Sequence, residues 1–294
     1  MKKIAIIPNE TKDVGLSVTK SLIEYLSGKA ELFMEDKFSP TGFGVTFKGR
    51  DIFDGVDCVI IIGGDGTMLS VAEPCGRNKI PVMGINMGTV GFMTEVEIDD
   101  MASACARLLS GDYKIEKRMM MDIRIVKNGM ETAKYSALND LVIAKTDTAM
   151  IPVELYSNEN KINEYIADGL IISTPTGSTG YSLSAGGPVA EPCMELFIAS
   201  PICAHMLGSR PMVLPSDKDI ILKLSDCQAS VAIDGNVLER ITSDDTIVIS
   251  KSAYTVDIIK MSKCSFYDVL INKLMSRTDY TTQIPKYLKK RRKK

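Results

Sequence analysis

The chain has 294 residues, of which 45% are hydrophobic and 24% are charged, and its net charge of −2 is ordinary for a folded globular protein. Its longest apolar run, Val59 to Ile62, is far too short to cross a bilayer, so we expect no membrane partner. The seven cysteines are scattered without a Cys-x-x-Cys pair, which argues against a disulfide framework or a zinc site and favours the cytoplasm. The basic segment 286–294 is typical of a solvated terminus, and the acidic remainder argues against nucleic-acid binding.

The first 118 residues alternate between strand-like and helix-like patterns. Strands are expected at Lys3–Pro8, Ala30–Met34, Cys58–Ile62 and Pro81–Ile85. Helices are expected at residues 15–26, 68–72 and 99–109, the last with Asp99 as its N-cap. This alternation predicts an α/β domain over residues 1–118, built on a parallel sheet with helices.

From residue 119 the pattern changes to short, often alternating runs separated by turn residues such as Asn128-Gly129 and Asp234-Gly235. Strands are expected at Met119–Val126, Lys134–Ile143, Ile151–Leu155, Ile220–Leu224, Ser230–Asp234 and Thr246–Ser250. The runs predict a mostly antiparallel β domain over residues 119–265, and a helix at Phe266–Ser276 opens a C-terminal segment, 266–294. No long linker separates the domains, so we expect tight packing and an active site in the cleft between them.

The pentapeptide Gly63-Gly64-Asp65-Gly66-Thr67 follows a buried strand and precedes a helix. Glycines let backbone N–H groups approach a ligand closely, and amides at a strand end and helix start suit phosphate. An aspartate there would repel phosphate unless it has a role, either in binding Mg²⁺ or in accepting a proton from an attacking hydroxyl. Both roles belong to phosphoryl transfer. The alternative is a plain tight turn with Asp65 as a helix cap.

Other nucleotide loops do not match. The segment has neither the Walker lysine nor the Gly-x-Gly-x-x-Gly spacing of a Rossmann dinucleotide site. By itself the pentapeptide resembles the donor-phosphate loop of NAD kinases, diacylglycerol and sphingosine kinases and 6-phosphofructokinases, the last with Ser in place of Thr.

Four further segments resemble NAD kinases in order and spacing. They are Gly84-Ile85-Asn86-Met87-Gly88 to Gly91-Phe92-Met93-Thr94, Leu138-Asn139-Asp140, Ala167-Asp168-Gly169-Leu170 with Ser173 to Pro188, and His205 to Pro215. The polar stretch from Thr176 to Ser184 is the most diagnostic, and lipid kinases lack it in this form. The chain is similar to the NAD kinase family over residues 3 to about 275.

The resemblance implies the 2′-phosphorylation of NAD by ATP, with Mg²⁺ accompanying the nucleotide, and a homodimer or homotetramer. It implies Asp65 as the base toward the ribose 2′-hydroxyl, with Gly64, Gly66 and Thr67 holding donor phosphates. The dinucleotide would contact Phe92, Asn139, Asp140, Asp168, Thr176, Ser178, Thr179, Gly180, Tyr181, Ser184, Ala199 and Asp234.

Each motif also has a structural interpretation. Asn139-Asp140 and Asp168-Gly169 are typical of turns, and Phe92 and Tyr181 of core positions. No Gly-x-Ser-x-Gly elbow accompanies the single histidine, His205, which we expect to be structural and hydrogen-bonded. The alternative functions are a lipid kinase using the same first loop, and a non-catalytic dinucleotide sensor.

Three positions depart from the family pattern. Asp140 replaces the usual Glu, Gly180 the common Ala, and Ile166 the Arg found in many NAD-preferring members. The loss of a cation beside the dinucleotide leaves open a preference for NADH over NAD.

Overall fold

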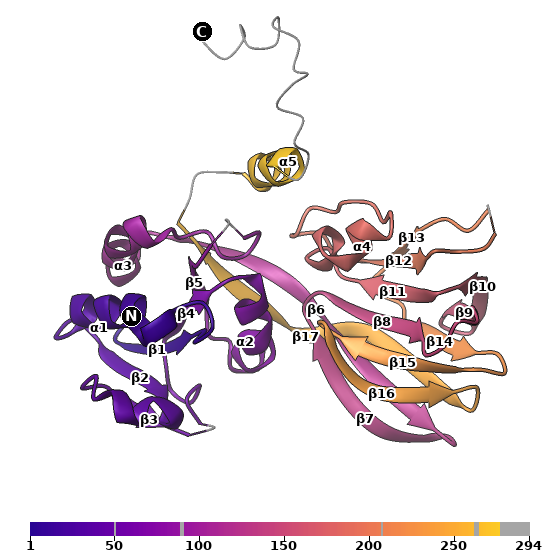
Figure 1. Ribbon diagram of the computed structural model, residues 1–294, viewed down its shortest axis with the longest axis horizontal. Helices are drawn as coiled ribbons and strands as arrows, with labels where there is room; N and C mark the ends of the chain where they lie inside the picture. Colours follow the sequence, from indigo (N-terminus) through magenta and orange to yellow (C-terminus); the bar gives the residue numbers. More distant parts are fainter. Residues whose placement is uncertain (50, 89–90, 207, 262–264, 277–294) are drawn as a thin grey trace, which may run out of the picture.

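The computed structural model describes residues 1–49, 51–88, 91–206, 208–261 and 265–276, and its two parts are joined by long strands (Figure 1). The first part holds the parallel strands β1 (Lys3–Pro8), β2 (Glu31–Glu35), β3 (Thr46–Lys48), β4 (Cys58–Gly63) and β5 (Val82–Asn86). Their spatial order is β3-β2-β1-β4-β5. The predicted parallel α/β architecture of the N-terminal part is confirmed.

Helices cover both faces of this parallel sheet. Alternate strand residues point to opposite faces, so Ile4 and Ile60 pack with α1 (Ser17–Leu26) and α3 (Met101–Ser110). Ala5 and Ile61 pack on the other face, with α2 (Asp65–Asn78). Single-turn 3₁₀ helices precede α1 (Val14–Leu16) and α3 (Ile98–Asp100), and a longer one, Asp36–Thr41, precedes β3.

The second part consists of two packed sheets, as predicted for a mostly antiparallel β domain. One has the order β13-β12-β11-β8-β15-β16, and the other continues the N-terminal sheet through β17, β14, β9 and β10, with β6 and β7 beside β17. A core of buried, mostly aliphatic residues lies between them. The strands are β6 (Lys114–Lys127), β7 (Met130–Ala137), β8 (Asp140–Lys145), β9 (Ile151–Ser157), β10 (Asn160–Ala167), β11 (Gly169–Ser173), β12 (Leu196–Ile202), β13 (Met212–Pro215), β14 (Ile220–Leu224), β15 (Gln228–Ile233), β16 (Asn236–Thr242) and β17 (Asp245–Lys260).

Two strands belong to both parts. β6 and β17 are 14 and 16 residues long and pair antiparallel along almost their whole length. At its far end β17 pairs in parallel with β5, through Ile258 and Val82, so one sheet runs through the whole molecule. β6 runs across residues 118–119, where the sequence suggested a boundary.

Several predicted elements differ from those observed. The strands predicted at Met119–Val126 and Thr246–Ser250 are parts of the longer strands β6 and β17. The predicted strand Lys134–Ile143 is two strands, β7 and β8, in different sheets, because the N–H groups of residues 138–140 bond to Asp234 and not to a neighbouring strand. Asp99 is not an N-cap: it lies in a 3₁₀ turn, and α3 begins after Asp100. The helix expected at 68–72 extends from Asp65 to Asn78, past Pro74, because its buried face packs on β4 and β17.

The remaining helices are α4 (Tyr181–Ser184), preceded by the 3₁₀ turn Gly177–Thr179, and α5 (Phe266–Ser276), which has the predicted bounds. The basic segment 286–294 lies outside the described residues. Within the described residues, no helix is long and apolar enough to cross a bilayer.

Candidate active site

The glycine-rich loop joins β4 to α2. Gly64 is the N-cap of α2, and its N–H donates to the Thr67 hydroxyl at 3.4 Å. Thr67 is buried and also accepts a hydrogen bond from the Asn9 amide at 3.1 Å, while a Cβ at Gly63 would overlap its hydroxyl. The first N–H groups of a helix have no partner within it, so the start of α2 offers donors to an anion at the sheet edge.

The Asp65 carboxylate turns away from the loop and onto the segment after β5. It accepts the N–H groups of Phe92 at 2.9 Å, Met93 at 3.0 Å and Thr94 at 3.2 Å, and the Thr94 hydroxyl at 3.3 Å. Gly91 makes room for it, because a Cβ there would overlap the carboxylate. Oδ2 accepts only the Phe92 N–H among these donors, so one lone pair on that oxygen can still receive a proton.

A second carboxylate organises the start of β8. Asp234, in the turn between β15 and β16, accepts the N–H groups of Leu138 at 2.9 Å, Asn139 at 2.8 Å and Asp140 at 3.0 Å. Asp234 has a positive φ of 46° and is followed by Gly235, a pairing typical of a tight hairpin turn. The turn thereby fixes the direction of the Asn139 and Asp140 side chains.

Asp140 is an unusual carboxyl group. Only 6% of the residue is exposed, and burial together with the nearby charge of Asp234 raises the pKa of Asp140 to about 7. Burial also raises the pKa of Asp234, although its three backbone hydrogen bonds act in the opposite direction. Perturbed carboxyl pairs of this kind are concentrated at functional sites.

The polar segment after β11 interlocks with the Asp140 region. The Thr174 hydroxyl donates to the Leu138 carbonyl at 2.5 Å, and its N–H donates to the Asn139 carbonyl at 2.9 Å. Gly177 lies so close to Asn139 that a Cβ would overlap the Asn139 carbonyl. The Asn139 side-chain oxygen is buried without a partner in the described residues, as expected of a group that awaits a ligand or water.

A cavity of about 370 Å³ is lined by residues from both parts of the molecule. Asn139, Asp140, Tyr181 and Asp234 line it from the C-terminal part. Leu69 lines it from α2. Leu69 is four residues after Asp65 and therefore on the same face of α2, about 6 Å along the helix axis. The Asp65 face of α2 thus borders the predicted dinucleotide site.

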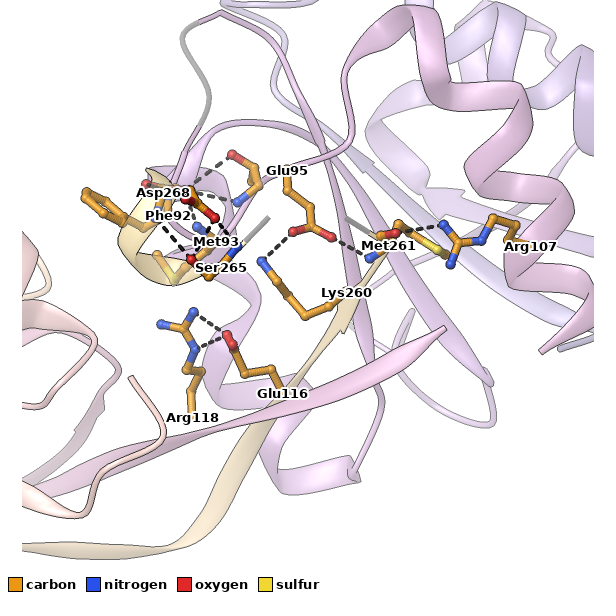
Figure 2. Close-up of polar contacts among 12 residues, drawn as sticks. Phe92, Met93, Glu95, Arg107, Glu116, Arg118, Lys260, Met261, Ser265 and Asp268 are labelled. Atoms are coloured by element: carbon orange, nitrogen blue, oxygen red, sulfur yellow. Dashed lines mark hydrogen bonds and ion pairs between the residues drawn. The ribbon is translucent and has the colours of Figure 1, made fainter. Parts of the chain in front are cut away.

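A larger cavity, of about 900 Å³, lies beneath α5. It is lined by Phe92, Arg118, Pro192 and Phe266 together with other residues of β6, β17 and α5. Arg118 is 2% exposed and contacts Glu116, at 2.5 Å, and the Thr176 hydroxyl, at 3.3 Å. Figure 2 shows Arg118 and Glu116 turned toward each other near the start of α5. The Arg118–Thr176 contact therefore connects this cavity to the polar segment.

Comparison with known proteins decides the family. Residues 11–113 match the ATP-NAD kinase N-terminal domain and residues 138–261 the ATP-NAD kinase C-terminal domain. The NAD kinase of Caldanaerobacter subterraneus subsp. tengcongensis is 38% identical, over 94% of this chain and 100% of the relative. The chain belongs to the ATP-NAD kinase family. It is accordingly a phosphotransferase.

Other relatives and solved structures match the chain over most of its length. The NAD kinase of Heliobacterium modesticaldum is 35% identical over 93% of this chain and 99% of the relative. An NAD kinase from Archaeoglobus fulgidus, solved in complex with ATP, has a TM-score of 0.71 at 25% identity, covering 93% of this chain and 99% of that one. Yeast NADH kinase complexed with NADH has the same fold, with a TM-score of 0.86 at 20% identity, over 97% of this chain and 90% of that one.

Within this NAD kinase fold, two predicted residues lie away from the cluster of Asn139, Asp140 and Asp234. Asp168 precedes Gly169, at one end of β11, whereas Ser173, at the other end, pairs with Asp140. The strand rise separates the two ends by about 13 Å. Asp168 instead pairs with Lys145 at 2.6 Å. Ala199 is fully buried in the core between the two sheets, so the structure offers none of its surface to a ligand.

The other predicted residues of the polar segment have different exposures. The Ser178 hydroxyl is buried and bonded to the Pro175 carbonyl at 2.6 Å, and Thr179 and Gly180 are half-buried. Tyr181 is 48% exposed and Ser184 is exposed, so their surfaces are open to a ligand.

Ile166, where many NAD-preferring family members have arginine, lies two residues before Asp168 in the chain. Ile166 is 38% exposed on β10, and its carbonyl accepts the backbone N–H of His205 at 2.9 Å. His205 itself is exposed, and this hydrogen bond is made by its backbone and not by its ring.

Sequence reasoning overlooked Arg118 and Thr174. Arg118 stands directly before three methionines in a strand, and a lone arginine among buried positions was the available signal. Thr174 could not be singled out, because its role depends on the carbonyl of Leu138, which is distant in sequence.

Proposed function

We propose that the protein transfers the γ-phosphoryl group of ATP to the 2′-hydroxyl of the adenosine ribose of NAD, giving NADP and ADP. The observation that carries the proposal is the shared cavity: α2 presents Asp65 and Leu69 on one face, and Leu69 borders the same space as Asn139, Asp140 and Asp234. The proposed phosphate site at the start of α2 therefore lies next to the proposed ribose site at Asn139, Asp140 and Asp234. The names of the 35–39% identical relatives support NAD as the acceptor.

Asp65 is proposed as the group that receives the hydroxyl proton. A carboxylate is too weak a base to deprotonate a free alcohol in advance. It can orient the hydroxyl and take the proton late, as the new P–O bond acidifies the oxygen. The remaining lone pair on Oδ2 serves this purpose, while the hydrogen bonds from residues 92–94 hold the carboxylate in place.

Each of the other predicted residues is proposed to bind either the phosphoryl donor, ATP, or the acceptor, NAD. Gly64, Gly66 and Thr67 are proposed to hold donor phosphates at the start of α2. Asn139, Asp140 and Asp234 are proposed to bind the ribose, with Tyr181 stacking on a base and Phe92, Thr176, Ser178, Thr179, Gly180 and Ser184 completing the pocket. Asp168, at the other end of β11, is proposed to contact a more distant part of the dinucleotide, whereas the fully buried Ala199 would act only through the residues that cover it.

Mg²⁺ is proposed to accompany ATP. In proteins, Mg²⁺ that accompanies a nucleotide usually keeps several water ligands and binds the substrate phosphates. When bound, it would offset the negative charge of the donor phosphates. The family resemblance further supports a cytoplasmic homodimer or homotetramer.

The competing acceptors are NADH and a lipid. Ile166 in place of arginine favours testing NADH, because that position lacks the charge found in many NAD-preferring members. A lipid kinase would share the first loop alone, whereas here the matched C-terminal domain spans the ribose cluster.

Replacing Asp65 by Asn tests the proposed base. We expect kcat to fall by about 10²- to 10⁴-fold, the usual contribution of a positioned acid or base, with the Kd for NAD nearly unchanged. Asp99→Asn, at an exposed position before α3, makes the same chemical change away from the site and serves as the control. An Asp65→Asn enzyme with wild-type kcat would show that the base is another group.

A further inference from the structure

The donor loop of this chain carries no lysine, yet an ammonium group lies over it. Lys12 follows β1, and a Cβ built at Gly64 would stand 2.5 Å from the Lys12 Nζ. Because β1 and β4 are adjacent and parallel, with Pro8 opposite Ile62, their carboxyl ends emerge at the same sheet edge (Figure 1). The fold therefore brings a cation from one loop to the phosphate loop of another strand.

The backbone that carries Lys12 is fixed by Asn9. The Asn9 side-chain oxygen accepts the N–H of Thr11 at 3.1 Å and that of Lys12 at 3.3 Å, which closes a tight turn. The Asn9 amide donates to Thr67, whose hydroxyl in turn accepts the Gly64 N–H. The two loops are thus tied together by hydrogen bonds, and the Lys12 position follows from that contact.

No carboxylate neutralises this ammonium group in the part of the chain that the structure describes. Glu10 contacts Lys37 at 3.6 Å, and the Asp13 carboxylate accepts the N–H groups of Val18 and Thr19 at the start of α1. The Asp65 carboxylate faces residues 92–94. A lysine and a helix start, both positive, therefore lie together without a protein anion between them.

We infer that Lys12 binds the terminal phosphates of the phosphoryl donor, an inference that rests on the proposed kinase function. The γ-phosphate must lie beside the hydroxyl that Asp65 orients, and Lys12 lies over Gly64, the residue before Asp65. It contacts the β- and γ-phosphates and not the nucleoside. Lys12 supplies from the β1 loop the charge that a Walker lysine supplies from within its own loop.

Kinetics of Lys12→Ala test this inference, with ATP varied at saturating NAD and, separately, with NAD varied at saturating ATP. We expect kcat/KM for ATP to fall at least about tenfold, which corresponds to about 1.4 kcal/mol, with KM for NAD within twofold of wild type. Lys12→Arg should recover most of the loss. Lys20→Ala, an exposed lysine on α1, is the matched control and should behave as wild type.

Direct binding of ADP and AMP to the same variants separates the possible outcomes. Lys12→Ala should weaken ADP at least about tenfold and leave AMP within twofold, because only ADP carries a β-phosphate. Equal ADP affinity in wild type and Lys12→Ala, or equal losses for ADP and AMP, would overturn the role of Lys12. A wild-type protein that binds ADP but forms no NADP would overturn the proposed function and leave the Lys12 comparison to be judged on ADP alone.

Discussion

Two carboxyl groups beside the small cavity, those of Asp140 and Asp234, differ in how they are held. Asp234 accepts three backbone hydrogen bonds, whereas Asp140 is buried beside that charge, with a pKa raised to about 7. In the unfolded chain an aspartate titrates near 3.9, so folding strengthens proton binding at Asp140. The protonated form stabilises the fold at low pH, and this contribution is lost as the pH rises through 7.

Asp140→Asn should therefore stabilise the free protein in a pH-dependent way. The free energy of unfolding of the variant minus that of wild type should rise by up to about 3 kcal/mol between pH 5 and pH 8, since each pKa unit corresponds to about 1.4 kcal/mol. Urea unfolding at four pH values measures it. Asp217→Asn, at an exposed position, is the control, and a difference that stays flat with pH would contradict the raised pKa.

At the scale of elements, α5 contacts residues 92–94, whose N–H groups hold the Asp65 carboxylate in place. The Phe266 ring lies 6.0 Å from the Phe92 ring, and the Lys273 Nζ lies 4.5 Å from the centre of the Phe92 ring. Figure 2 shows the start of α5, with Ser265 and Asp268, beside Phe92 and Met93. Phe92 in turn donates its N–H to Asp65, so α5 supports the carboxylate indirectly.

Phe266→Ala should lower kcat about three- to tenfold, because an aromatic pair contributes about 0.5 to 1.5 kcal/mol beyond its buried area. KM for ATP should stay near wild type, since Phe266 acts through Phe92 and not on the donor. Ile271→Ala, at a half-exposed position of the same helix, controls for loss of helix packing. If kcat is unchanged in Phe266→Ala, α5 does not position Asp65.

Some elements could be predicted from local sequence and others could not. The apolar pattern gave α5 its observed bounds, and the β-branched run before Gly63-Gly64 gave β4, because both patterns are local. The break between β7 and β8 could not be predicted, because it depends on Asp234, about 95 residues away. The same holds for Arg118, whose contact with Thr176 spans 58 residues.

At the scale of the whole molecule, β6 and β17 make the two parts one continuous sheet. The motifs were visible in sequence as separate segments, but the approach of α2 to Asn139, Asp140 and Asp234 at one cavity depends on these shared strands. The structure confirms the α/β and antiparallel parts, whereas the site roles of Asp65, Asn139 and Asp168 remain proposals. Asp168 shows why: the family resemblance placed it with the others, but the length of β11 separates it from Asp140.

The measurement that tests the proposed reaction most directly is product identification. Purified protein is incubated with NAD, ATP and Mg²⁺, and the product is offered to an NADP-specific dehydrogenase, with NADH and diacylglycerol as alternative acceptors in parallel. We expect NADP to accumulate in step with ADP, and diacylglycerol to remain unphosphorylated. ADP formation without NADP or NADPH, or phosphorylation of the lipid, would contradict the assignment.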